Sequence, residues 1–282
     1  MKIFRRAQGM VSIVIPFYER LEYLRRCLDS LKACCNDFDE IIVADDGSSE
    51  VTVMQLKELI GNYPFPVKYV SQPRHGFRVA AARNNGVRYA QGEYLIFLDS
   101  DFLVFPDTIK QHLSLAKPKR FVAAHCKYLT EEQTRIFFRS NVSSRLIENL
   151  YKESSNREII KQHRRFIKRT ILMRLHLAGP DKQSLGGHFS IYRKDFEYIN
   201  GYDENFVGWG GEDEDLGIRL IKAGIYGRSA ILHARALHLW HPRELGDKHW
   251  KEGPNIRYFK RKDVPFFCEN GLKKSVAAGT ST

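Results

Sequence analysis

The sequence predicts an α/β fold in which a mostly parallel central sheet is flanked by helices. Through about the first hundred residues, short continuous apolar runs alternate with helical patterns, as in sheets whose strands are joined by crossover helices. Polar turns rich in Asp, Gly and Ser follow several of these runs. A chain of 282 residues, 43% of them hydrophobic, is long enough to bury the core that such a fold needs.

The first part of the chain is expected to alternate strand and helix. Each predicted strand is a short apolar run, and each predicted helix is supported by its residue pattern. The strands are expected at 11–16, 40–44, 67–70 and 94–98, and the helices at about 21–31, 51–60 and 79–90, with Gly92 as a stop signal. A short helix after Pro106 and a strand at 121–129 should follow.

The rest of the chain differs in composition. Residues 131–177 are polar and basic without strand alternation, and the stretch from Gly186 is rich in glycine and aromatic residues. A helix is expected at 216–223, ending at Gly224. We predict one domain over 1–262, divided at about 11–129, 131–183 and 185–242, with a tail at 263–282 whose last residues, 277–282, are expected to be disordered.

The net charge of +12 is unusual, and it favours nucleic acid, anionic membrane or phosphorylated substrates as partners. No apolar run approaches the ~20 residues of a membrane span, and no secretory signal is recognised. The five cysteines form no CxxC pair, so free and mostly buried thiols in a reducing, cytoplasmic compartment are expected.

Asp99-Ser100-Asp101 follows the predicted strand at 94–98. Ligands of open α/β sheets bind at the carboxyl ends of the strands, so this turn is expected at the functional edge. Carboxylates one residue apart can share a divalent cation such as Mn²⁺ or Mg²⁺, which bridges to phosphate oxygens. A solvated acidic turn is the alternative.

Asp45-Asp46-Gly47-Ser48 follows the strand at 40–44 and is expected at the same edge. Its short polar side chains could accept hydrogen bonds from a base or a ribose. An Asx-type turn would use the same residues, and both interpretations stay open.

Trp209-Gly210-Gly211-Glu212-Asp213-Glu214-Asp215 combines an indole, two glycines and four carboxylates. Glycines let the backbone approach a ligand, the indole suits a sugar ring, and adjacent carboxylates can raise a pKa. The alternative is a helix start whose acids meet the helix dipole. The tryptophan and glycines favour a functional site.

His238-Leu239-Trp240-His241 lies late in the chain. A histidine there could add a nitrogen ligand to a metal held by oxygens. Only the fold could bring it to Asp101, and a structural role is the alternative.

Several motifs, taken in order along the chain, resemble those of a known family. Four of them are Pro16-Phe17-Tyr18-Glu19-Arg20, Asp45-Asp46-Gly47-Ser48, Ala82-Arg83-Asn84 and Asp99-Ser100-Asp101. Together they resemble family 2 glycosyltransferases with the GT-A (nucleotide-diphospho-sugar transferase) fold. Leu185–Ser190, Asn200–Asp203 and Trp209–Asp213 are similar to the C-terminal half of β1,4-galactosyltransferases and of bacterial chondroitin-type polymerases. The resemblance covers about 11–129 and 185–242, and nothing aligns with 131–183.

The resemblance implies a role for each matching residue. Asp213 would be the catalytic base, with Glu212 binding sugar hydroxyls beside it. Asp101 and His241 would hold the metal, with Asp99 and His238 as less certain ligands. The nucleotide-sugar would be held by Pro16, Phe17, Tyr18, Glu19, Asp45, Asp46, Arg83, Asp99 and Ser100. The acceptor or its sugar would contact Gly187, His188, Trp209, Gly210 and Gly211.

The function implied is inverting transfer of a hexose or N-acetylhexosamine from a UDP-sugar, with Mn²⁺ or Mg²⁺, to a glycan or lipid-linked glycan. Bacterial surface polysaccharide or lipopolysaccharide synthesis is the expected setting. A metal-independent sugar-nucleotide enzyme is one alternative. A basic nucleic-acid-binding protein is another, but no recognition module is found and no nucleic acid partner is expected.

Residues 157–176 hold seven Lys or Arg and one acidic residue, with apolar residues at roughly helical spacing. Two interpretations stay open. The segment could contact an anionic membrane, making the protein peripheral on the inner face of the cell membrane. It could instead be a solvated helix that covers the acceptor side.

Overall fold

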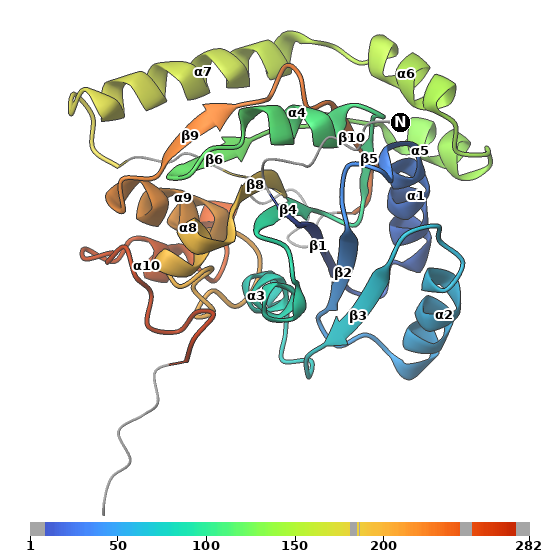
Figure 1. The fold of residues 1–282 in the computed structure, drawn as a ribbon, viewed down its shortest axis with the longest axis horizontal. Coiled ribbons are helices and arrows are strands. Elements are labelled where there is room, and N and C mark those ends of the chain that lie inside the picture. The colour runs from blue at the N-terminus through green and yellow to red at the C-terminus, as the bar shows by residue number, and fades with distance from the viewer. Residues whose placement is uncertain (1–8, 181–184, 186, 243–249, 275–282) are drawn as a thin grey trace, which may run out of the picture.

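The computed structural model describes residues 9–180, 185, 187–242 and 250–274. Its central sheet has the strand order β3-β2-β1-β4-β8-β6-β9 (Figure 1). The first four strands in the chain are mutually parallel, whereas β8 runs antiparallel to β4 and β6. The strands are β1 (Val11–Phe17), β2 (Glu40–Asp45), β3 (Val67–Ser71), β4 (Tyr94–Leu98), β6 (Arg120–Ala123), β8 (His188–Tyr192) and β9 (Tyr226–Ser229).

Helices cover both faces of this sheet, and two large apolar clusters fill the space between. One face carries α1 (Leu21–Leu31), α2 (Glu50–Ile60) and α4 (Thr108–Leu115). The other carries α3 (Val79–Tyr89), α7 (Arg157–Arg174), α8 (Arg193–Tyr198) and α9 (Glu212–Lys222). Strands buried on both faces have continuous apolar sequences, and the predicted α/β fold is confirmed.

A second sheet of three strands, in the order β5-β10-β7, lies beside the first. Its strands are β5 (Phe102–Val104), β10 (Ala236–His238) and β7 (Lys127–Tyr128), and α5 (Glu131–Phe138) and α6 (Ser144–Glu153) pack on it. Strand β10 pairs antiparallel with β5, which places His238 opposite Phe102. This pairing carries the late histidines to the turn after β4.

Several elements differ from the sequence prediction. The strand expected at 121–129 is two strands, β6 and β7, which belong to different sheets. Strand β8 was not predicted, and α9 begins at Glu212 rather than at 216. Gly92 is not the stop signal of α3, which ends at Tyr89; a Cβ there would lie 2.5 Å from the Ser12 nitrogen, so its small size permits a close backbone approach.

The region 131–177 forms α5, α6 and α7; α7 agrees with the helical spacing expected at 157–176, whereas α5 and α6 were not predicted. After β10 come the short helices η2 (Trp250–Glu252) and α10 (Ile256–Phe259), and η1 (Lys32–Cys34) extends α1. The predicted tail from residue 263 packs on the domain as far as 274, with Val264 and Cys268 buried; residues 277–282 lie outside the described residues. All five cysteines are free thiols, as predicted.

None of the helices in the described part of the chain has the length and apolarity required to cross a membrane.

Candidate functional site

The candidate site forms where the parallel strands β1, β2 and β4 end. The turn after β4 is held there by β8, because the Asp99 amide donates to the carbonyl of Gly187 over 2.9 Å. A Cβ at Gly187 would lie 1.6 Å from Asp99 Oδ2, so only glycine leaves room for the Asp99 side chain. Gly187, predicted to contact a sugar, therefore has a clear role in shaping the acidic turn.

Asp101, His238 and His241 come together at this edge. His241 Nε2 lies 3.1 Å from Asp101 Oδ2, and His238 Nε2 lies 3.6 Å from Asp101 Oδ1. One ligand atom from each of the three residues lies within 4.8 Å of the others. The structure thus brings together three of the four residues predicted for the metal, although 137 positions separate Asp101 from His238.

This cluster fits a divalent cation. Asp101 Oδ1 is buried, and in the described part of the chain it has no hydrogen-bond partner. A buried carboxylate oxygen without a partner is costly, and a cation would satisfy it. One carboxylate and two imidazoles are ligands that Mn²⁺ accepts, with room for oxygens of a substrate.

The Asp101 carboxylate of this cluster is ionised without a metal. Burial alone would raise the pKa of Asp101, but the neighbouring His238 and His241 outweigh burial and hold that pKa below its usual value. Burial would lower the pKa of His241, but its bond to Asp101 raises it. Asp101 is therefore ionised at neutral pH, which is the form that binds a metal.

Arg83 connects the acidic turn to the start of α9. This residue of α3 is 3% exposed, and its guanidinium donates to Asp99 Oδ1 at 2.8 Å and to Asp213 Oδ1 at 3.2 Å. Glu212 Oε1 lies 3.9 Å from the same group. One buried cation thus fixes the distance between the residues predicted for the donor and those predicted for the acceptor.

Asp213 receives a second hydrogen bond from Tyr202, whose hydroxyl donates to Oδ1 over 2.9 Å. Within the described residues, Asp213 Oδ2 has no hydrogen-bond partner. Glu212 is more buried than Asp213, and its Oε2 also lacks a partner there. Burial, reinforced by the charge of Asp213, raises the pKa of Glu212 to about 8. These acids occupy the first turn of α9, where they meet the helix dipole, as the helix-start alternative expects.

The loop before α9 is held by glycines and by one amide. Gly208, Gly210 and Gly211 have φ of 92°, 94° and 95°, which other residues rarely adopt. The side chain of Asn255 donates to the carbonyls of Gly208 and Gly210, both at 2.9 Å. Trp209 lies between Gly208 and Gly210 in this loop and is half-buried.

The turn after β2 is closed by its own hydrogen bonds. Asp45 accepts from the amide and hydroxyl of Ser48 and from the hydroxyl of Tyr69. Asp46 accepts from Gln72 and Arg74 side chains and from the Arg78 amide. Both carboxylates are buried, so the structure favours the Asx-type turn that was the alternative for this motif.

The segment Pro16–Glu19 divides into buried and exposed parts. Pro16 and Phe17 are buried in β1, and the Glu19 carboxylate accepts from Ser49 and Thr52 at the start of α2. Tyr18 is 40% exposed, and the Arg74 guanidinium lies 3.7 Å from its ring centroid. Among the four residues of this segment, all predicted to bind the nucleotide-sugar, Tyr18 alone presents a large exposed surface. Ser100, between Asp99 and Asp101, is half-buried.

His188 was predicted to contact a sugar, but its ring is only 1% exposed. Its Nε2 lies 2.9 Å from Nε2 of His112, whose Nδ1 bonds the hydroxyl of Ser190. Burial lowers the pKa of His112 to about 3 and that of His188 well below its usual value. The ring is part of a neutral network inside the molecule, because β8 runs through the centre of the sheet.

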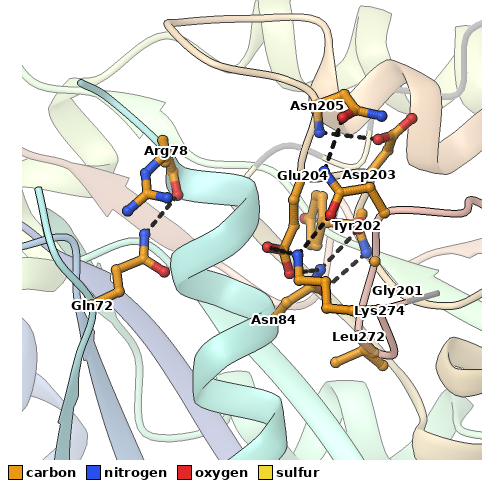
Figure 2. Close-up of polar contacts among 12 residues, drawn as sticks. Gln72, Arg78, Asn84, Gly201, Tyr202, Asp203, Glu204, Asn205, Leu272 and Lys274 are labelled. Carbon is orange, nitrogen blue, oxygen red and sulfur yellow. Dashed lines mark hydrogen bonds and ion pairs between the residues drawn. The ribbon is translucent and has the colours of Figure 1, made fainter. Parts of the chain in front are cut away.

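Sequence reasoning gave no role to Asn84 or Tyr202, although both lie in quoted motifs. Figure 2 shows the Asn84 amide on α3 directed at the loop 201–205. Its Nδ2 donates to the Tyr202 carbonyl at 2.8 Å and to Glu204, and its Oδ1 accepts from the Tyr202 amide at 3.0 Å. Asn84 thus fixes the loop from which Tyr202 reaches Asp213. In the sequence, the only indication that Asn84 and Tyr202 matter is that each lies in one of the motifs that resemble the family.

Two family models match the chain. The glycosyl transferase family 2 model matches residues 12–197. A model described as the N-terminal domain of galactosyltransferase matches residues 169–241, which include the late histidines. Together these models cover nearly all of the residues that form the site.

Curated relatives are longer proteins. Chondroitin synthase of Escherichia coli is 31% identical in an alignment 276 residues long that covers 91% of this chain and 39% of that protein. Validoxylamine A glucosyltransferase of Streptomyces hygroscopicus subsp. jinggangensis is 32% identical in an alignment 232 residues long that covers 77% of this chain and 52% of that protein. The chain thus spans about half of these relatives or less.

Solved structures share the fold. A mannosyltransferase from Pyrobaculum calidifontis, in complex with GDP-Man and Mn²⁺, aligns with a TM-score of 0.56 and 17% identity over 84% of this chain and 59% of that one. GalNAc-T7 with UDP, GalNAc and Mn²⁺ aligns with a TM-score of 0.58 and 19% identity over 83% of this chain and 44% of that one. At these identities the likeness establishes the GT-A fold alone.

Proposed function

Because this chain belongs to glycosyl transferase family 2, we propose that it transfers a hexose or an N-acetylhexosamine from a UDP-sugar to a hydroxyl of a glycan or glycolipid acceptor. One observation carries the proposal. Arg83 bonds both Asp99, beside the Asp101 cluster, and Asp213, at the start of α9. The turn that would bind the metal and the candidate base are thus joined by one buried cation, which supports a transfer between two substrates.

Asp101, His238 and His241 are the residues that would hold the cation. A divalent cation bound there would supply charge to neutralise the diphosphate that leaves. The solved neighbours that contain Mn²⁺, one with GDP-Man and the other with UDP and GalNAc, support the use of a divalent cation. Tyr18 would offer its exposed ring to the base of the nucleotide, beside the guanidinium of Arg74.

Asp213 would act as the general base. Tyr202 and Arg83 both bond its Oδ1, which orients the carboxylate and leaves Oδ2 to accept the proton of the attacking hydroxyl. That hydroxyl would attack the anomeric carbon opposite the diphosphate and invert the configuration. General-base help of this kind is worth about 10²–10⁴-fold in rate.

Glu212 would bind the acceptor rather than remove its proton. Its buried Oε2 needs a partner, and a sugar hydroxyl would supply one. Trp209, half-buried in the preceding loop, would pack on the sugar ring. The relation to chondroitin synthase supports a carbohydrate acceptor, and we place the reaction in bacterial surface polysaccharide or lipopolysaccharide synthesis.

A donor screen for UDP-sugar hydrolysis with Mn²⁺ tests the proposal without knowledge of the acceptor. We expect one or a few UDP-sugars to be hydrolysed, and EDTA to abolish the reaction. Hydrolysis that survives EDTA would favour a metal-independent sugar-nucleotide enzyme. Once an acceptor is found, Asp213→Asn should abolish transfer, while the matched variant Glu214→Gln, in the same helical turn, should retain it. Near-full turnover of Asp213→Asn would refute the assignment of the base.

A further inference from the structure

Helix α7 carries two separate apolar faces. Ile159, Phe166 and Met173 are buried against the sheet, where α7 runs along β9 at its edge (Figure 1). Ile171 and Leu175 are 51% and 61% exposed on the outside of the helix. One inward face is enough to hold a surface helix in place. The outward apolar residues therefore do not serve to attach α7 to the domain.

Basic residues surround the outward apolar face. Arg164, Arg165 and Lys168 are exposed, and none of them forms an ion pair with any residue that the structure describes. A shallow hollow on this face is lined by His163, Arg164, Ile167, Lys168, Ile171 and Leu172. Apolar and cationic side chains thus alternate over one continuous surface.

The mixed apolar and basic surface continues from α7 onto the neighbouring strands of the sheet. A second hollow shares Ile167 and Ile171 with the first and reaches β6 and β9. It adds three further basic residues, Arg120, Arg174 and Arg228. The surface is therefore wider than a single helix, and its charge has one sign.

The chemistry of this surface selects its partner. Nucleic acid would neutralise the cations but would leave exposed isoleucine and leucine side chains without a partner. The headgroup layer of an anionic bilayer accepts both, because apolar side chains enter the acyl boundary while Lys and Arg remain at the phosphates. We infer that the outer face of α7, with the adjoining edge of β9, binds the surface of an anionic lipid bilayer.

Flotation of the full chain with vesicles tests this inference. Wild-type protein should float with phosphatidylcholine vesicles that contain phosphatidylglycerol, should remain at the bottom with pure phosphatidylcholine, and should release in high salt. Two double variants address the two components: Ile171→Ser with Leu175→Ser, and Arg164→Glu with Lys168→Glu. Each should reduce vesicle binding by about tenfold or more.

The controls lie on α2, on the other side of the sheet. Met54 is 67% exposed and Lys57 is exposed, so Met54→Ser with Lys57→Glu changes an apolar and a cationic side chain away from α7. This variant should float like the wild type. Unchanged thermal melting of all variants would show that the domain remains folded.

Three results would overturn the inference: no flotation of the wild type, equal flotation with neutral vesicles, or α7 variants that float as well as the control. A DNA gel shift that depends on Arg164 and Lys168, without flotation, would assign the face to nucleic acid instead. The inference does not depend on sugar transfer, so the donor screen and the flotation assay can fail separately.

Discussion

At the scale of single residues, the candidate site depends on a buried network around Arg83. Its guanidinium lies among three acids, Asp99, Glu212 and Asp213. A buried cation whose partners are removed is strongly destabilising, and acids without the cation would repel each other. Arg83 therefore sets the charge of the site as well as its geometry.

Tyr202→Phe tests whether the hydroxyl of Tyr202 orients Asp213. The ring is fully buried, so phenylalanine should fit while the bond to Asp213 is lost. A hydrogen bond to a charged group is worth about 1.5–3 kcal/mol, so kcat should fall by roughly ten- to a hundredfold with little change in UDP affinity. Steady-state kinetics and calorimetry measure the two effects. The matched control is Tyr63→Phe, which removes a bond to the Asp29 carboxylate on α1, outside the site, and should leave kcat unchanged. Equal effects of both variants on kcat would refute a positioning role.

Glu212→Gln tests the raised pKa of Glu212. The unfolded chain loses this proton near the usual pKa of about 4.3, whereas the folded protein keeps it until about pH 8. The stability that this proton contributes is complete below the usual pKa and is lost as the pH rises through 8.

Glutamine has no proton to lose, so the stability of the variant relative to the wild type should increase from pH 5 to pH 9. The increase should be on the order of a few kcal/mol. Urea unfolding in EDTA at several pH values measures it. Parallel stability profiles would show that Glu212 titrates normally.

Individual residues show where sequence reasoning stopped. The DxD pattern after an apolar run was sufficient to predict that Asp101 lies at the carboxyl end of a strand, because the strand fixes where the turn lies. His188 was misplaced, because nothing local shows that its strand runs through the centre of the sheet. For Asp45 and Asp46, a turn and a ligand site use the same residue types, and only the fold shows the bonds from Tyr69, Gln72 and Arg74 that favour the turn.

At the scale of elements, α3 and the loop 201–205 support the site together. Asn84 and Arg83 are adjacent on α3: the first holds the loop, and the second bonds the acids. The helix thus positions Tyr202 and Asp213 at the same time. Loss of either contact should therefore displace both Tyr202 and Asp213.

Asn84→Ala tests this support. The substitution leaves the buried amide and carbonyl of Tyr202 without their partners, which should cost roughly 2–4 kcal/mol of unfolding free energy and reduce turnover. Denaturant unfolding measures the first effect.

Asn85→Ala is the matched control on the next residue. The Asn85 side chain makes one exposed bond to Ser71, so this substitution should cost less than about 1 kcal/mol of unfolding free energy. Similar losses in both variants would contradict the argument.

The elements that were predicted well are those with a local signal. Strands β1, β2 and β4 are continuous apolar runs because both faces are buried. Strand β8 was missed because His188-Phe-Ser-Ile-Tyr192 mixes polar and apolar residues, and its polar side chains find partners only in the fold, as Ser190 does with Tyr94 and His112. The division of 121–129 into β6 and β7 likewise depends on a second sheet that local pattern does not reveal.

At the scale of the whole molecule, the second sheet completes the site. The pairing of β10 with β5 brings His238 and His241 to Asp101, which ends up beside residues far along the chain. The family resemblance predicted that these residues hold a metal, and only the fold shows that they lie close together. The acidic residues and the proposed metal ligands gather where the parallel strands end, while α7 presents its exposed cations beside the edge strand β9.

The most direct test of the proposed metal-dependent donor site is calorimetric titration of UDP, with Mn²⁺ and with EDTA, into the wild type, Asp101→Asn and Asp213→Asn. We predict that the wild type and Asp213→Asn bind UDP when Mn²⁺ is present and lose at least about tenfold in affinity in EDTA, because a cation held by Asp101 would supply the positive charge that attracts the diphosphate. Asp101→Asn should bind weakly under both conditions. Equal affinity of the wild type with Mn²⁺ and with EDTA, matched by Asp101→Asn, would contradict a metal-dependent donor site.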